Sequence, residues 1–197
     1  MSHYFTNDSS PMVTREITAT VFGCELVFTT ANGVFSGSRL DLGTSVLLRS
    51  VVPPERGRVL DLGCGFGPIA VGIAAASPGV QVDAVDVNER ALALTRMNAE
   101  RARVADRVRT FSPDDAVYDE IWSNPPIRIG KKALHELLLG WLPRLTPKGV
   151  AYLVVSKNLG ADSLSVWLTD QGWPTQKLAS AKGFRVLQVR RGDDSPS

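Results

Sequence analysis

Strand-like and helix-like segments alternate over most of the chain, and this alternation constrains the fold more than any other feature. Apolar segments typical of buried strands lie at residues 57–63, 80–88, 107–111, 118–124 and 149–157. Segments with helical spacing of apolar residues lie at residues 67–77, 89–104, 131–145 and 161–172. Strands separated by helices of ten to fifteen residues are typical of βαβ units. The sequence therefore predicts an α/β fold whose parallel sheet is covered by helices on both faces.

The N-terminal part has a different pattern. Residues 15–23 and 24–30 have the loose alternation of short strands and meet at Gly23, which predicts a β-hairpin. Asn32-Gly33 is a turn signal, and helical spacing follows over residues 41–52. We therefore expect an N-terminal β-hairpin extension before the alternating section.

The C-terminal part closes with a second hairpin. Residues 173–180 and 183–191 predict two antiparallel strands that join one edge of the sheet. The complete prediction is a Rossmann-like seven-stranded sheet, mostly parallel with an antiparallel C-terminal edge. We expect a β extension over residues 1–40, the main domain over 41–191, and a disordered polar tail over 192–197.

The composition excludes several classes of protein. Hydrophobic residues make up 44% of the chain, and no apolar run has the length of a membrane span or a signal-peptide core. The two cysteines, Cys24 and Cys64, lie far apart and form no metal-ligand pattern, so neither a disulfide nor a metal site is predicted. A net charge of +2 is too small to indicate nucleic-acid binding by itself. We expect a cytoplasmic protein with no metal and no membrane contact.

A glycine-rich loop follows the first strand of the alternating section. Gly63, Gly65 and Gly67 lie between a predicted strand and a predicted helix, where glycine permits a tight turn and close approach of a ligand to the backbone. Asp61 precedes the loop, and Asp86 follows the next strand 23 positions after Gly63. An acid about 20 residues beyond such a loop accepts hydrogen bonds from ribose hydroxyls. The pattern favours a nucleoside-type cofactor over a purely structural turn.

The spacing within this loop narrows the choice of cofactor. A dinucleotide pyrophosphate suits G-x-G-x-x-G, whereas this loop is G-x-G-x-G with Asp61 at its start. A carboxylate there would repel a diphosphate, but it would hold a cationic amino group directly or through water. S-adenosylmethionine carries an amino-acid moiety and no phosphate, so the sequence favours this methyl donor.

The segment "IWSNPPIRIG" ends a predicted strand at Asn124, before Pro125 and Pro126. In open α/β sheets, ligands bind at the carboxyl ends of the strands. Two prolines make the turn rigid, so the Asn124 side-chain oxygen and the Pro125 carbonyl are expected to face one point. Two fixed acceptors suit a planar amino group, because they can accept both of its hydrogens and draw the nitrogen toward tetrahedral geometry. The nitrogen lone pair is then free to attack a methyl-sulfonium. The alternative is a structural role, in which Asn124 only caps the next helix.

These motifs carry a resemblance to a known family. "VLDLGCGFGPIAVGIA", "VDAVDVNERALALTRMNA" and "IWSNPPIRIGKKALHELL" resemble class I S-adenosylmethionine-dependent methyltransferases of the methyltransferase small domain group. That group includes bacterial small-subunit ribosomal RNA guanine-N2 methyltransferases, and the similarity runs from "HYFTNDSSP" to "KGFRVLQV". The resemblance implies that the main domain is a methyltransferase domain.

The resemblance also implies which residues form the site. The implied catalytic residues are Asn124, Pro125, Pro126 and Ile127. The implied cofactor-binding residues are Asp61, Gly63, Cys64, Gly65, Gly67, Asp86, Val87, Ser112, Asn124 and Thr44. Phe35, Asp41 and Thr44 are candidates for lining the pocket, although Asp41 or Thr44 could instead start a helix.

Two positions depart from the family pattern. Ile127 stands where relatives commonly carry an aromatic residue that stacks on the acceptor, so Phe35 or Phe184 could supply a ring instead. Ser112 or Asp114 stands where an acidic residue often contacts the adenine of the donor.

The leading hypothesis is methylation of the exocyclic N2 amine of a guanine in small-subunit ribosomal RNA. A protein glutamine amide, adenine or a small-molecule amine is an alternative acceptor, and a catalytically silent domain that binds RNA or a partner protein is a further alternative. A basic cluster of Arg128, Lys131 and Lys132 follows the Asn-Pro-Pro turn and could contact RNA phosphates.

Overall fold

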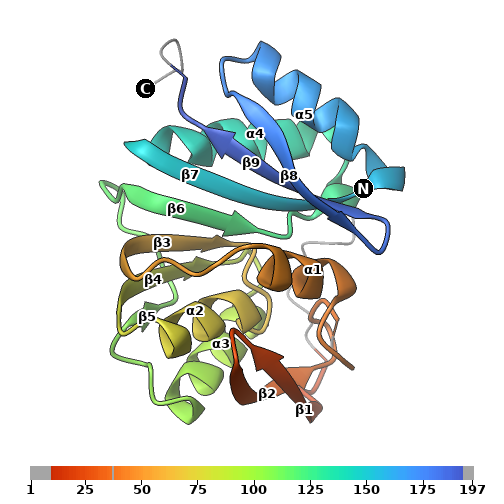
Figure 1. The fold of residues 1–197 in the computed structure, drawn as a ribbon. Coiled ribbons are helices and arrows are strands. Elements are labelled where there is room, and N and C mark those ends of the chain that lie inside the picture. The colour runs from red at the N-terminus through yellow and green to blue at the C-terminus, as the bar shows by residue number, and fades with distance from the viewer. Residues whose placement is uncertain (1–9, 37, 193–197) are drawn as a thin grey trace.

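The computed structural model describes residues 10–36 and 38–192 and contains a single large sheet (Figure 1). Seven strands pair in the order β5-β4-β3-β6-β7-β9-β8. Their bounds are Arg56–Leu62 for β3, Gly79–Val85 for β4, Val108–Arg109 for β5, Tyr118–Ser123 for β6, Leu145–Ser156 for β7, Thr175–Ala181 for β8 and Phe184–Arg190 for β9. Neighbouring strands from β5 to β7 are parallel, and β9 runs antiparallel to β7 and β8. The predicted Rossmann-like sheet is confirmed.

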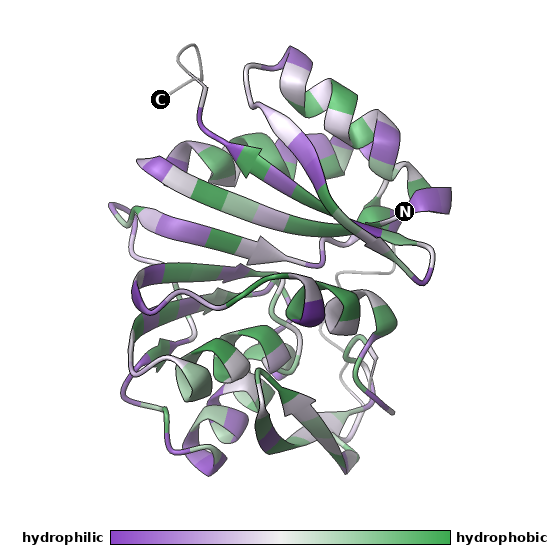
Figure 2. Cartoon of the chain, in the orientation of Figure 1, coloured by the Kyte–Doolittle hydropathy of each residue, from purple (hydrophilic) through white to green (hydrophobic). Residues whose placement is uncertain are grey.

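Helices cover both faces of the sheet (Figure 1). Helices α1 (Leu42–Ser50), α2 (Pro68–Ala76) and α3 (Glu89–Arg101) pack on one face, whereas α4 (Lys131–Trp141) and α5 (Ala161–Asp170) pack on the other. Alternate strand residues supply the two cores, because successive side chains of a strand point to opposite faces. In β6, for example, Trp122 enters the first core and Ile121 the second. Figure 2 shows that α2 is hydrophobic along almost its whole length, which suits its position between the sheet and the N-terminal hairpin.

The N-terminal hairpin is confirmed as a separate two-stranded sheet. Strands β1 (Thr14–Val21) and β2 (Cys24–Ala31) pair antiparallel around Phe22 and Gly23, whose φ angles are both positive. Positive φ at both loop residues matches the twist of a two-residue hairpin. The hairpin contributes Val21 and Phe28 to the core that α2 and α3 share. The division of the chain at residue 40 stays a prediction, and the tail beyond residue 192 lies outside the described residues.

Several predicted boundaries were wrong. The helix predicted over residues 131–145 ends at Trp141, because a 3-10 turn over Leu142–Arg144 accommodates Pro143, which lacks an amide hydrogen. Strand β7 consequently begins at Leu145, four residues earlier than predicted. The strand predicted over 107–111 shortens to the two residues of β5, since only Val108 and Arg109 pair with β4.

Candidate active site

The glycine loop lies between β3 and α2, at the carboxyl ends of the parallel strands. Gly63, Gly65 and Gly67 have φ angles of 77°, 57° and 90°, which favour glycine. A Cβ atom on Gly63 or Gly65 would meet no described atom within 4 Å, whereas one on Gly67 would lie 2.9 Å from the Thr95 side chain. Gly67 therefore permits close packing of α3, and the backbone at Gly63 and Gly65 stays accessible to a ligand.

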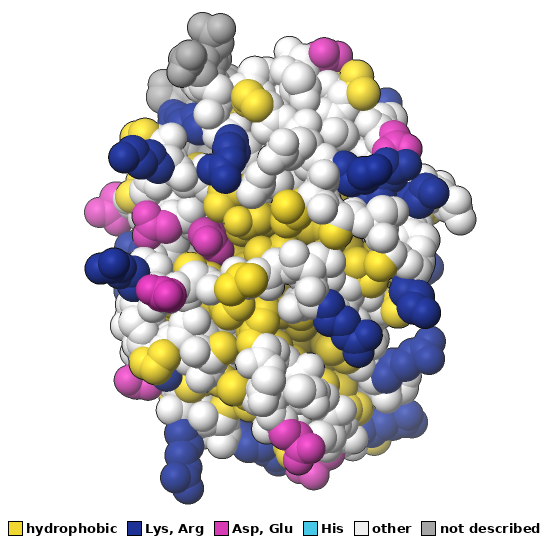
Figure 3. Space-filling model, viewed as in Figure 1, with side chains coloured by type: hydrophobic (Ala, Val, Ile, Leu, Met, Phe, Trp, Pro, Cys, Tyr) yellow, Lys and Arg dark blue, Asp and Glu magenta, His cyan; other side chains and the backbone are white. Residues whose placement is uncertain are grey.

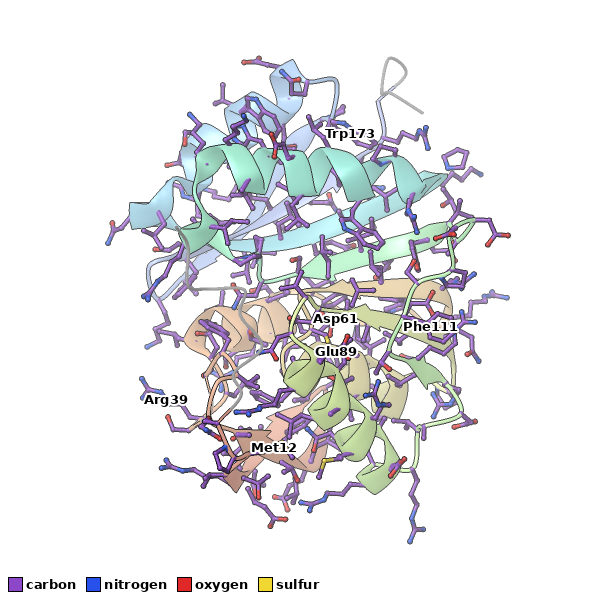
Figure 4. All side chains as sticks on the ribbon, turned by 180° about the vertical axis from the view of Figure 1, so that it is seen from behind. Met12, Arg39, Asp61, Glu89, Phe111 and Trp173 are labelled. Atoms are coloured by element: carbon purple, nitrogen blue, oxygen red, sulfur yellow. The ribbon has the colours of Figure 1, made fainter. Side chains whose placement is uncertain are left out.

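Asp61 lies directly beneath this loop. Its side chain is buried, within the body of the molecule in Figure 4. Oδ2 accepts a hydrogen bond from the Ala70 amide at 3.0 Å, and Oδ1 has no hydrogen-bond partner in the part of the chain that the structure describes. Burial, reinforced by the Asp86 charge and opposed by the Ala70 amide, raises the pKa of Asp61 to about 7. The carboxyl group is thus poised to ionise near neutral pH when a cationic partner approaches.

Asp86 follows β4 and connects it to the loop. Its Oδ2 accepts a hydrogen bond from the Gly65 amide and its Oδ1 accepts one from the Asn88 amide, each at 2.9 Å. Ionised carboxylate oxygens accept more than one hydrogen bond, so both oxygens retain capacity for ribose hydroxyls. The next side chain, Val87, is 67% exposed and is available as an apolar surface for an adenine.

Two predicted cofactor residues direct their side chains elsewhere. The Cys64 thiol is buried 3.5 Å from the Thr95 hydroxyl, so only the backbone of Cys64 faces the loop. The Ser112 hydroxyl bonds with the hydroxyl of Tyr118, the first residue of β6, and with Arg144. Figure 4 shows the neighbouring Phe111 on the side of the molecule opposite Arg39. The structure does not bring the Ser112 hydroxyl to the glycine loop, and its contact with adenine stays a prediction.

Asn124 is held beside the loop in one orientation. The Ser123 hydroxyl donates to the Leu62 carbonyl at 2.7 Å, which places Asn124 next to Gly63. The Asn124 amide nitrogen donates to Asp41 Oδ2 at 2.7 Å and to Thr44 Oγ1 at 3.1 Å. A carboxylate only accepts, so the nitrogen and not the oxygen of the amide must face Asp41. Within residues 10–36 and 38–192, no group donates a hydrogen bond to the Asn124 oxygen.

The two prolines form a tight turn after Asn124. Pro126 has φ −75° and ψ 75°, and the Ile127 amide donates to the Pro125 carbonyl at 2.8 Å. This is an inverse γ-turn, and it leaves the Pro125 carbonyl one further acceptor position. Ile127 packs against the core beneath α4 and α5, on the opposite face from the Asp41–Asn124 contact.

The first turn of α1 belongs to the site. Asp41 caps α1 by accepting a hydrogen bond from the Thr44 amide at 3.0 Å, so its capping role and its contact with Asn124 coexist. A Cβ on Gly43 would lie 2.9 Å from the Phe184 ring, which shows how closely that ring approaches this turn. Phe35 is 66% exposed. Of the two candidate rings, the structure places Phe184 beside the residues that hold Asn124.

Sequence reasoning missed two residues that support the loop. The Asn98 amide on α3 donates to the Thr29 and Phe66 carbonyls and accepts from the Thr29 amide, with distances of 2.7–2.9 Å. The Thr95 hydroxyl donates to the Gly65 carbonyl at 3.0 Å. Both side chains are buried on the apolar face of α3. A polar residue at a core-facing helical position was the signal that could have identified them.

Charge is unevenly distributed around the site. On the face drawn in Figure 3, Lys and Arg side chains lie on both sides and along the lower edge, whereas most Asp and Glu side chains lie toward the left-hand side. Among the described residues, no three His, Cys, Asp or Glu side chains could hold a metal ion. No helix in the described part is long and apolar enough to cross a membrane.

Comparison with known proteins identifies related sequences. The model of the methyltransferase small domain family matches residues 25–188. Uncharacterized protein YbxB of Bacillus subtilis is 32% identical over 174 residues, which cover 85% of this chain and 87% of that protein. Ribosomal RNA small subunit methyltransferase C of Pasteurella multocida is 36% identical over 166 residues, which cover 80% of this chain and 49% of that protein.

A solved structure extends the comparison to the fold. The T. thermophilus 16S rRNA N2 G1207 methyltransferase, in complex with AdoMet and guanosine, superposes with a TM-score of 0.78 at 25% sequence identity. The match covers 92% of this chain and 51% of that chain. This chain therefore spans about half the length of the ribosomal RNA methyltransferases that it matches.

Proposed function

Because the chain belongs to the methyltransferase small domain family, we propose that it methylates the exocyclic N2 amine of a guanine in small-subunit ribosomal RNA. Family membership makes the chain an S-adenosylmethionine-dependent methyltransferase, and the acceptor is the proposed part. The observation that carries the acceptor proposal is the fixed orientation of Asn124, whose amide oxygen is directed away from Asp41.

The residues around the glycine loop fit the donor. The accessible backbone at Gly63 and Gly65 suits close approach of a nucleoside, and Asp86 retains acceptor capacity for its ribose. The unpartnered Asp61 oxygen suits the amino group of the methionine moiety, with a water molecule as intermediary because this oxygen is closed to solvent. S-adenosylmethionine, when bound, supplies an electrophilic methyl group on its sulfonium.

The Asn-Pro-Pro turn fits an amino acceptor. The Asn124 oxygen and the free position on the Pro125 carbonyl would accept the two hydrogens of an exocyclic amine. Accepting both hydrogens would draw the nitrogen toward tetrahedral geometry and free its lone pair for attack on the methyl carbon. The carbon–sulfur bond would break as the carbon–nitrogen bond forms, with S-adenosylhomocysteine as the leaving group, and the methylated nitrogen would then lose one proton to solvent. The chain contributes preorganised acceptors and alignment, and this step needs no covalent enzyme intermediate.

Ribosomal RNA is favoured by the relatives and by charge. Relatives between 32% and 38% identical are named ribosomal RNA small subunit methyltransferase C. Arg128, Lys131 and Lys132 follow the Asn-Pro-Pro turn at the end of β6, and all three are exposed. Cations there would position RNA phosphates. A ribosomal acceptor also implies a cytoplasmic location.

The test is methyl transfer from labelled donor to three acceptors: small ribosomal subunits from a strain that lacks the enzyme, total transfer RNA, and a peptide-chain release factor. We expect label in small-subunit RNA, recovered as N2-methylguanosine after digestion. Asn124→Ala should lower kcat by roughly 10²–10³-fold, with the affinity for S-adenosylhomocysteine unchanged within about threefold. Gln81→Ala, an exposed amide in β4, is the matched control and should behave as the wild type.

Other outcomes would exclude the proposal in distinguishable ways. Label on the release factor alone would identify a protein amide as the acceptor. Label in RNA as N6-methyladenosine would replace guanine by adenine. Donor binding without transfer to any of the three acceptors would favour a silent binding domain.

A further inference from the structure

A shallow depression of about 600 Å³ lies on the sheet itself, where β3 and β4 begin. It is lined by Gly57, Arg58, Gly79, Gln81 and Arg109, and we call it the Arg58 depression. Ligand pockets commonly have volumes of about 300–1,000 Å³, so it has room for a group the size of a nucleotide. No residue of the glycine loop or of the Asn-Pro-Pro turn lines it.

The Arg58 depression lies far from the site of methyl transfer. It is at the amino-terminal ends of β3 and β4, whereas the glycine loop and Asn124 follow the carboxyl ends of their strands. A strand advances about 3.3 Å per residue, so the length of β4 separates the two ends of the sheet by roughly 20 Å. A group bound in this depression is therefore not the acceptor base, and a substrate that reaches both places must be large.

This part of the sheet is open because no helix follows β5. The segment that joins β5 to β6, residues 110–117, contains no helix. On the same face, α4 and α5 pack over Leu60 and Leu62, nearer the carboxyl end of β3. Arg58 points to this face because it lies two residues before Leu60. The uncovered positions carry polar and charged side chains instead of apolar ones.

A buried carboxylate holds two guanidinium groups at the Arg58 depression. Asp83 Oδ2 accepts a hydrogen bond from Arg58 Nε at 3.1 Å and lies 2.9 Å from Arg58 Nη2. Asp83 Oδ1 accepts one from Arg109 Nε at 2.9 Å and lies 2.8 Å from Arg109 Nη2. Within residues 10–36 and 38–192, no acceptor bonds to Nη1 of either arginine, so both Nη1 groups keep their N–H donors.

The cluster presents positive charge to solvent. The Arg58 and Arg109 side chains are 30% and 38% exposed, whereas the Asp83 side chain that they share is closed to solvent. Asp119 adds a negative charge at the rim, where its Oδ2 accepts a hydrogen bond from the Arg58 amide, and the exposed Arg56 beside Gly79 adds a positive one. The excess is positive, and guanidinium N–H groups match the oxygens of a phosphate.

An exposed aromatic ring lies beside the cluster. The Arg109 guanidinium carbon is 5.5 Å from the centroid of the Phe111 ring, and Phe111 is 57% exposed. Figure 4 shows Phe111 on the side of the molecule opposite Arg39. Single-stranded RNA is bound by this combination, in which a ring stacks on a base and cations contact the phosphates.

We propose that the Arg58 depression binds a nucleotide of the RNA substrate that is remote from the acceptor guanine. Its phosphate lies on Arg58 and Arg109, and its base stacks on Phe111. The proposal rests on the proposed function, because the bound nucleotide belongs to the RNA that is methylated. The contact holds the RNA without touching the reacting groups, so its loss lowers the affinity for RNA and leaves kcat unchanged.

The first test varies the charge at Gln81, an exposed side chain at the depression, and measures Kd of the full chain for protein-free small-subunit RNA. We expect Gln81→Glu to raise Kd about fivefold, Gln81→Lys to lower it about threefold, and Gln81→Ala to leave it unchanged. Thr18→Glu and Thr18→Lys, at an exposed position of the hairpin on the other face of the sheet, are the matched controls and should leave Kd unchanged. The affinity for S-adenosylhomocysteine should stay the same in all variants.

The second test removes the stacking ring. Phe111→Ala should raise Kd for the RNA about fivefold, in keeping with the loss of one stacked base. Val117→Ala, at a position that is 55% exposed in the same segment, should leave Kd unchanged. Equal Kd values for Phe111→Ala and the wild type would exclude the stacking contact.

A third arm identifies the bound phosphate. In a synthetic RNA fragment, each phosphate is replaced in turn by a neutral methylphosphonate. At one position several nucleotides from the acceptor guanine, this should raise Kd of the wild type about fivefold, and there Gln81→Glu should have no further effect. A Gln81→Glu defect that persists at every position, or that disappears only next to the acceptor, would overturn the inference.

The remaining outcomes separate this inference from the proposed function. Methylation of RNA by the wild type, together with equal Kd values across the Gln81 series, would overturn the inference alone. A Gln81 effect confined to intact subunits would overturn it as well, by making a ribosomal protein the occupant. Absence of RNA methylation by the wild type would instead remove the proposed function.

Discussion

The Asn124 amide nitrogen lies 2.7 Å from Asp41 Oδ2, although the two residues are 83 positions apart in the chain. This hydrogen bond fixes the orientation of the amide, and under the proposed function it would present the amide oxygen to the acceptor. An unrestrained amide could rotate and present its nitrogen, which would repel an amine that has only hydrogens to donate. Under the proposed function, Asp41 would therefore be a positioning residue that acts through Asn124.

The Thr44 hydroxyl offers a specific test of this positioning. Thr44→Val removes the second acceptor for the Asn124 nitrogen, while the backbone amide that Asp41 caps remains. We expect kcat to fall about three- to tenfold, equivalent to roughly 1 kcal/mol, and the affinity for S-adenosylhomocysteine to fall by a smaller factor. Asp41→Ala should lower kcat further and also the melting temperature, whereas Asp41→Asn keeps an oxygen for both bonds and should restore most of the activity. Equal kcat values for Asp41→Ala and the wild type would contradict the role.

Asp61 makes the stability of the donor-free protein depend on pH. Its pKa is raised from 3.8 to about 7, so the folded state holds a proton that the unfolded state has lost. Stability therefore falls as the pH rises from about 4 to about 7. Asp61→Asn removes this ionisation, and its free energy of unfolding relative to the wild type should rise by roughly 2–3 kcal/mol between pH 5 and pH 8. Urea denaturation at the two pH values measures the difference, and a pH-independent difference would refute the assignment.

Asn98 couples the hairpin to the glycine loop. Asn98→Ala leaves the buried Thr29 amide and carbonyl and the Phe66 carbonyl without this partner. We expect a loss of about 2–4 kcal/mol in the free energy of unfolding and weaker binding of S-adenosylhomocysteine at a temperature where the variant remains folded. Asn88→Ala removes an exposed hydrogen bond to the Gly33 carbonyl and the N-cap of α3, which accepts from the Arg90 amide, so it should cost less, about 1 kcal/mol. A larger loss for Asn88→Ala would contradict this prediction.

The two cysteines should differ in reactivity. Cys64 is buried, and burial together with the nearby Asp61 and Asp86 charges raises the pKa of its thiol well above the usual value. Cys24 is half-buried in β2. Since the thiolate is the reactive form, iodoacetamide should modify the native chain at Cys24 and spare Cys64. Mass spectrometry of the intact and denatured protein checks this, and rapid native modification of Cys64 would show that the loop opens.

The parts of the site that depend on local sequence were predictable. The glycine loop and Asp86 follow strands whose apolar composition identifies them, and Asp61 lies near the end of the first of these strands. Neighbouring parallel strands end at the same edge. Pro125 and Pro126 likewise fixed the end of β6 from sequence alone.

The contacts between distant segments could not be predicted in the same way. The sequence singled out Asp41 and Thr44 as candidates, but it did not indicate that both hold Asn124, because that contact depends on how α1 packs against the sheet. Ser112 was predicted to contact the adenine of the donor because it follows a predicted strand. In the structure this strand, β5, is only two residues long, and the Ser112 hydroxyl bonds with the Tyr118 hydroxyl. Side-chain direction at such a turn is set by tertiary contacts.

The approach of the Phe184 ring to Gly43 has a consequence for the timing of assembly. Strand β9 lies between β7 and β8, so the surface against which α1 rests is incomplete until residue 184 has been synthesised. A nascent polypeptide that already contains the donor loop and Asn124 would still lack the support that places Asp41 and Thr44. The placement of Asp41 and Thr44 beside Asn124 therefore depends on a strand that is made after the donor loop and Asn124.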